Sequence, residues 1–314
     1  MGQWLAIVAF AVAAAAQAQP ATLRVMGFSG SANWPIFVAQ DTGLFAARGL
    51  KVDLMAAPNS TTQIALLRSG EIDIALTAID NIVPYPDQLF AFLGMNDGGR
   101  ISLIAAPGIK RIAELKDRAL AVDALASGYA FVLMEMLARG GLAPGNYVLL
   151  SVGGSRERLR ALQEGKASGA LLNAPADAAA EAAGFVRLAS SAEVLTHYQG
   201  SVGAAQRAWA GQHGDVLVRY IAAYIAALDW LYAPANRAEA LRVLERRVGL
   251  DARSAERSYA ELVAQGSLAR KAALDVDGIR AVLGLRSRFA PAPPPSTDPS
   301  RYYDLSYYEK ALAR

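Results

Sequence analysis

The sequence SANWPIFVAQDTGLFAARGLKVDLMAAPNSTTQIALLRSGEIDIALTAIDN, residues 31–81, decides the fold. Two helices are predicted in it, at residues 35–48 and 60–69, and each follows a short apolar strand and ends at a glycine. A third apolar run, residues 72–77, leads to Asp80 and Asn81. This alternation is typical of an open α/β sheet, in which the carboxyl ends of the strands meet at one ligand-binding crevice.

The same alternation continues beyond this stretch. A second unit has predicted strands at residues 119–123, 147–152 and 169–172, with helices between them. A returning strand is expected at residues 202–206, and a long helical region begins near residue 215. Two serial units of this kind predict an α/β protein with two lobes, each built on a mostly parallel sheet flanked by helices.

The first 18 residues carry no charged side chain, contain a short apolar run and end in Ala16-Gln17-Ala18. An apolar stretch followed by an A-x-A site is typical of a cleavable secretory signal peptide, although the segment lacks the usual basic start. We therefore expect export, with no cysteine after the apolar run to carry a lipid. A buried alanine-rich helix is the alternative interpretation.

The composition excludes several classes of function. The chain has 31 basic and 28 acidic residues without a basic stripe, so no nucleic-acid partner is expected. The segment RERLR, residues 156–160, alternates in charge and is typical of a solvated helix face. The absence of cysteine excludes thiol catalysis and cysteine-based metal sites. With two isolated histidines and no phosphate-binding loop, the sequence predicts no catalytic residue, metal or cofactor.

Several short motifs carry a family resemblance: WPxFVA at residues 34–39, GLF at 43–45, LxSGEIDIA at 67–75 and RALxxGK at 160–166. In this order and spacing the chain resembles the periplasmic substrate-binding proteins of ABC importers for sulfonates, nitrate, taurine and thiamine-pyrimidine precursors. The resemblance implies a type II-like fold with two hinge crossovers, lobe one at residues 21–106 plus 203–314 and lobe two at 107–202. It also implies a monomeric, periplasmic, non-enzymatic protein that delivers a small polar or anionic organic solute to the membrane subunits of a permease.

The expected ligand site is formed by loops that follow strands. Backbone N–H groups at helix starts favour an anionic group there. An aromatic wall and polar contacts from both lobes would complete the site. The expected ligand-binding residues are Ser31, Asn33, Trp34, Asp80, Asn81, Ser127, Gly128 and Asn173. Ordinary helix caps, a core aromatic and a turn residue are the alternatives for these positions.

Asp80 bears on the charge of the ligand. A carboxylate in the crevice disfavours a small, strong anion, because like charges repel. If Asp80 faces the crevice, the ligand carries a hydrogen-bond donor or a cationic group; otherwise Asp80 caps the next segment. The alternative function is an exported enzyme on the same fold, although a cysteine-dependent thiamine-pyrimidine synthase is disfavoured by the lack of cysteine. A sensory role is not separable from transport.

Overall fold

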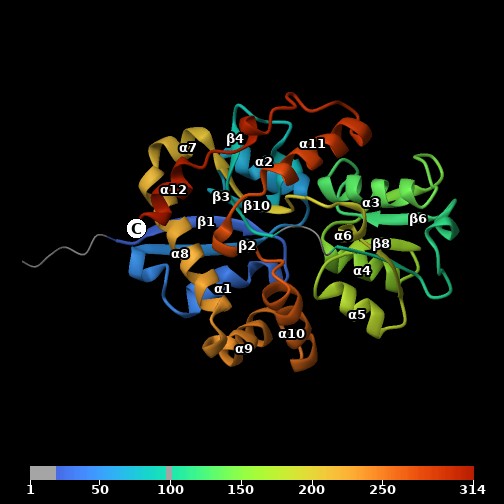
Figure 1. Ribbon diagram of the computed structural model, residues 1–314, viewed down its shortest axis with the longest axis horizontal. Helices are drawn as coiled ribbons and strands as arrows, with labels where there is room; N and C mark the ends of the chain where they lie inside the picture. The colour runs from blue at the N-terminus through green and yellow to red at the C-terminus, as the bar shows by residue number, and fades with distance from the viewer. Residues whose placement is uncertain (1–18, 97–100) are drawn as a thin grey trace, which may run out of the picture.

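The computed structural model of the protein describes residues 19–96 and 101–314. This part of the chain forms two five-stranded sheets, each flanked by helices. The two sheets lie side by side along the long axis of the molecule (Figure 1). The expected α/β fold with two mostly parallel sheets is therefore confirmed. The signal peptide expected at residues 1–18 lies outside the described residues.

The first sheet has the order β2-β1-β3-β10-β4 and the second has the order β7-β6-β8-β5-β9. In each sheet one strand, β10 or β5, runs antiparallel to both of its neighbours, and the other described pairs are parallel. The strands are β1 (Ala21–Gly27), β2 (Leu50–Ala56), β3 (Ile74–Ala78), β4 (Leu89–Gly94), β5 (Ser102–Ala105), β6 (Ala119–Val122), β7 (Val148–Ser151), β8 (Gly169–Leu172), β9 (Val186–Ser190) and β10 (Ser201–Gln206).

The helices cover both faces of each sheet, so β3, β4, β5 and β8 are buried along their whole length. They are α1 (Trp34–Asp41), α2 (Ser60–Ser69), α3 (Gly128–Arg139), α4 (Ser155–Gln163), α5 (Ala176–Ala182), α6 (Ser191–Val194), α7 (Arg207–Gln212), α8 (Gly214–Tyr232), α9 (Arg237–Val248), α10 (Ala252–Tyr259), α11 (Val276–Phe289) and α12 (Ser306–Leu312). Short 3₁₀ turns include η1 (Ser31–Asn33) and η3 (Ile79–Ile82).

The antiparallel strands lie next to the crossovers between the sheets. The chain leaves the first sheet after β4 and enters the second at β5, and it returns at β10. The strand at residues 102–105, which the sequence pattern put in lobe one, therefore belongs to the second sheet. An apolar strand has no feature that tells which of two similar sheets it joins, so the boundary expected at residues 106–107 was placed too late.

Each lobe has an apolar core of its own, and a third apolar cluster is shared by both lobes. Under the first sheet, α8 packs against α1, and the Tyr220 ring stacks on Phe45 and meets Phe92 edge to face. The shared cluster continues from the first lobe, with Ile79, into the second lobe, with Phe131. Helix α11 packs against both η3 and α3, so it joins the lobes on one side (Figure 1).

The aromatic tail folds back onto the first lobe. Helix α12 packs against α8, and the ring of Tyr307 lies 5.8 Å from that of Phe90. Among the described residues no single helix is long and apolar enough to cross a membrane; helices 214–232 and 234–248, bent by 82°, match such a span only when taken together.

The close packing of Gly94, at the end of β4, against the backbone of Ala273 can be tested by substitution. A Cβ atom on Gly94 would overlap the carbonyl oxygen of Ala273, which is backbone and cannot rotate away. We expect Gly94→Ala to lower the free energy of unfolding by about 1–3 kcal/mol, measured by urea titration. Gly211→Ala is the control: nothing lies within 4 Å of its new Cβ, and alanine stabilises a helix by about 0.5–1 kcal/mol. Equal stabilities of the two variants would contradict the predicted crowding.

Candidate functional site

A cavity lies between the two lobes, at the carboxyl ends of strands from both sheets. The loop after β1, the end of β3 and the start of β10 line it from the first lobe, and the loops after β6, β7 and β8 line it from the second. It leaves about 40 Å³ open to the centre of a water molecule, which is room for about three waters. Its lining residues are Phe28, Ser29, Gly30, Ala32, Asn33, Leu76, Ala78, Asn81, Met95, Asp123, Ser127, Tyr129, Ser155, Arg158, Asn173 and Ser201.

Arg158 is the only basic side chain among the residues that line this described cavity. It lies on α4, its residue is only 4% exposed, and one Nη donates to Ser155 Oγ at 2.9 Å. Its Nε has no hydrogen-bond partner, and among the described residues no carboxylate is within ion-pairing distance. Burial lowers the pKa of Arg158, but a guanidinium stays charged at neutral pH. The cavity therefore contains a buried positive charge without a counter-ion bonded to it, which is costly unless an anion binds there.

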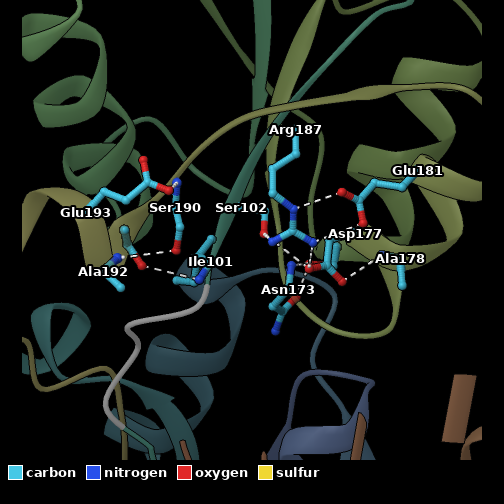
Figure 2. A network of polar contacts seen from close by, with 12 residues as sticks. Ile101, Ser102, Asn173, Asp177, Ala178, Glu181, Arg187, Ser190, Ala192 and Glu193 are labelled. Carbon is cyan, nitrogen blue, oxygen red and sulfur yellow. Dashed lines mark hydrogen bonds and ion pairs between the residues drawn. The ribbon is translucent and has the colours of Figure 1, made fainter. Parts of the chain in front are cut away.

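The groups around Arg158 form a chain of hydrogen bonds. Ser155 Oγ accepts from Arg158 and donates to Asn173 Oδ1. Asn173 begins the turn into α5, and that helix is fixed to β5 and β9 by Arg187, as Figure 2 shows. Arg187 donates to Asp177 at 3.1 Å and to Glu181 at 2.9 Å. This network holds the turn, and with it Asn173, at the edge of the cavity.

Asp123 is the only carboxylate among the residues that line the described cavity. It follows β6 and is 5% exposed. Ser127, the N-cap residue of α3, donates to its Oδ1, and Ser60 donates to its Oδ2 at 2.7 Å. Since Ser60 belongs to α2 of the first lobe, this hydrogen bond joins the two lobes directly beside the cavity.

Four of the eight expected ligand-binding residues line the cavity: Asn33, Asn81, Ser127 and Asn173. Asn33 Nδ2 donates to Phe28 O at 2.7 Å, and Asn81 Nδ2 donates to Thr77 Oγ1 at 2.9 Å. Each of these two amides therefore holds its own loop through Nδ2. Their role in ligand binding stays a prediction.

Ser31 and Trp34 do not line the cavity. Ser31 Oγ lies 3.4 Å from Ser258 Oγ, in hydrogen-bonding contact with α10. The Trp34 side chain is fully buried, its Nε1 donates to Ala240 O at 3.1 Å, and its ring meets Tyr259 edge to face. The expectation of an aromatic wall is corrected: Trp34 is a core residue, because α9 and α10 cover it.

Asp80 and Gly128 also lie outside the cavity lining, and they contact each other across the lobes. A Cβ on Gly128 would stand 2.6 Å from the Cβ of Asp80, so only glycine allows this approach. Asp80 is 1% exposed, and its Oδ2 accepts from Arg286 of α11 at 2.9 Å, while its Oδ1 has no partner. The expectation that Asp80 would face the ligand is therefore corrected: the carboxylate lies in the contact between the lobes.

Arg158 and Asp123 line the cavity but were not among the ligand-binding residues expected from the sequence. Arg158 lies within the segment RERLR that was interpreted as a solvated face, but Arg158 and Leu162 occupy the buried side of α4 at positions i and i+4. Asp123 stands at the carboxyl end of β6, which is the position where this fold binds ligands. That position was the available signal. No cluster of metal-ligating side chains occurs among the described residues.

Comparisons with known proteins agree on the fold. A sequence model of the NMT1-like family matches residues 16–245. None of the curated proteins matches the chain.

Solved structures share the fold at low sequence identity. The alkanesulfonate-binding protein SsuA from Xanthomonas axonopodis pv. citri, bound to MOPS, is 19% identical with a TM-score of 0.76, covering 91% of this chain and 99% of that one. The periplasmic nitrate-binding protein NrtA from Synechocystis PCC 6803 is 13% identical with a TM-score of 0.79, covering 94% and 89%. The ligand-binding component of an ABC-type import system from Staphylococcus aureus, with zinc bound, is 16% identical with a TM-score of 0.76, covering 93% and 99%.

The buried carboxyl of Asp80 predicts a pH-dependent stability. Burial raises the pKa of Asp80 to about 7, although Arg286 opposes the shift. Between the unfolded pKa near 3.8 and about 7 the folded state holds a proton that the unfolded state releases, so this group lowers stability as pH rises. Relative to wild type, Asp80→Asn should gain up to about 1.4 kcal/mol per pH unit across this window. Urea unfolding at several pH values measures it, and parallel pH profiles of the two proteins would refute it.

Proposed function

The chain belongs to the NMT1-like family, and from this premise we propose that it is a solute-binding protein of an ABC importer. It captures a small organic solute with an acidic group in the cavity between the two lobes and delivers it to the membrane permease. The neighbouring structures of a sulfonate-binding protein, a nitrate-binding protein and a ligand-binding import component support the role.

One observation carries the proposal: the buried, unpaired guanidinium of Arg158. Removing a charge from water without a partner costs several kcal/mol, and an acidic group of the ligand offsets this cost by pairing with the guanidinium. A planar guanidinium also matches two oxygens of a carboxylate or sulfonate at once. Hydroxyl and amide groups of the lining supply the further polar contacts that fix orientation.

Binding stabilises the closed arrangement of the lobes. Contacts between the lobes meet at the cavity, including the hydrogen bond from Ser60 to Asp123 and the 3.3 Å contact between the Tyr129 and Ser201 hydroxyls. A ligand that touches both lobes binds the closed form more tightly than the open form, and it therefore shifts the population toward closure. The lobes are residues 21–94 with 201–314, and 102–194, each joined to the other by the two crossovers.

The protein acts outside the cytoplasmic membrane as a binding protein and not as an enzyme. The uncharged apolar leader with its A-x-A site supports export and cleavage after Ala18. A chain without cysteine offers no thiol for covalent catalysis. The protein works as a monomer that meets the permease once loaded.

Arg158→Gln tests the anion site. Calorimetric titration with sulfonates, carboxylates and nitrate should show binding to the wild type and at least about a tenfold loss in the variant, because a charge-assisted pair is removed. Arg160→Gln, an exposed arginine of the same helix, is the control and should bind as the wild type does. Unchanged affinity of Arg158→Gln for an acid that binds the wild type would contradict the assignment.

If the lobes close on the ligand, the protein becomes more compact when it binds. Small-angle scattering should show a smaller radius of gyration when a bound acid saturates the protein, since lobes that swing about two crossovers come together. At the same ligand concentration Arg158→Gln should show a smaller decrease in the radius, because a smaller fraction of the variant is bound. Identical scattering of the empty and saturated wild type would exclude the hinge.

A further inference from the structure

We infer that the solute carries a protonated amine as well as an acidic group, and that Asp123 accepts the amine while Arg158 holds the acid. This inference rests on the proposed function and specifies the ligand of the same cavity. It assigns the solute to the small zwitterions, such as amino acids or aminosulfonates, and not to the simple anions.

The carboxylate of Asp123 can accept further hydrogen bonds. An ionised carboxylate offers about four acceptor positions, and the two serine hydroxyls that donate to Asp123 occupy two of them. The side chain lines the cavity and is almost fully buried. An ammonium group entering the cavity would find a carboxylate that is already oriented by Ser60 and Ser127 and still able to accept hydrogen bonds.

The cavity is lined by one positive and one negative side chain. Arg158 and Asp123 line one cavity and influence each other electrostatically, yet no ion pair joins the two among the described contacts. An anion paired with Arg158 would leave Asp123 as a second negative charge in a poorly solvated space, where like charges repel strongly. A zwitterion pairs with both side chains, and the loaded cavity then stays neutral.

The other residues that line the cavity leave room for only a short molecule. The space is small, and Asn33, Asn81, Asn173 and several hydroxyls surround it, while Phe28, Leu76 and Met95 provide the apolar part. No other carboxylate and no other basic side chain lines this described cavity. The acid and the amine are therefore separated only by the few atoms that fit between Arg158 and Asp123.

Matched pairs of compounds test the inference. Calorimetric titration of the mature protein at pH 7 would compare 2-aminoethanesulfonate with ethanesulfonate, and β-alanine with propionate, because each pair differs only by the amine. The zwitterion of at least one pair should bind about tenfold or more tightly than its acid-only partner. Acid-only compounds that bind as tightly as their amino counterparts would overturn the inference and leave the proposed function standing, whereas failure of every acid to bind would overturn the proposed function itself.

Two variants separate a ligand contact from a structural role. Asp123→Asn should weaken the zwitterion about tenfold or more and leave the acid-only partner unchanged or tighter, because a like charge is removed. Glu164→Gln, an exposed carboxylate at the end of α4, should change neither. Equal losses for both compounds in Asp123→Asn would show that Asp123 only supports closure, and the inference would be wrong.

Discussion

The buried guanidinium of Arg158 is the constraint on which the rest of the site depends. Its Nε lacks a partner, and its Nη2 donates to the neutral hydroxyl of Ser155. A protein could neutralise such a charge with its own carboxylate, and this chain does so elsewhere, where Asp80 pairs with Arg286. Arg158 is 4% exposed and the Arg286 side chain is 11% exposed, but only Arg286 has a carboxylate partner among the described residues. The difference is best explained if the counter-charge of Arg158 arrives with the ligand.

The fold explains why so much polar chemistry converges beside Arg158. Parallel strands direct their carboxyl ends to one edge of each sheet, and loops at the edges of both sheets line the same cavity. Asp123, Ser155 and Asn173 all follow strands of the second sheet, and Asn33 and Asn81 follow strands of the first. The helices that begin there are capped by the same loops; Ser127 both caps α3 and orients Asp123. Ser127 can therefore cap a helix and also belong to the ligand site.

Local sequence patterns were sufficient for the fold and for the loops of the site, but not for which side chains enter the cavity. The glycine stops and apolar runs of residues 31–81 predicted β2, α2 and β3 closely. Trp34 and the strand at Ser102–Ala105 were misplaced because their surroundings come from distant segments: α9 and α10 cover the indole, and β8 and β9 pair with the strand. Arg158 was missed because a charged helix face is solvated or buried according to the elements against which the helix packs, which for α4 are β6, β8 and α5.

The carboxylate that bears on the charge of the ligand is Asp123 and not Asp80. Asp80-Asn81 suggested that a carboxylate makes a simple anion site unfavourable. In the structure Asp80 accepts a hydrogen bond from Arg286 and packs against Gly128 of the other lobe. Asp80 therefore belongs to the contact between the lobes and not to the ligand site. The carboxylate that faces the cavity is Asp123, and it does so opposite a cation. A single carboxylate would favour a cationic ligand and a single guanidinium an anionic one. The pair, held apart in one small cavity, favours a molecule that carries both charges.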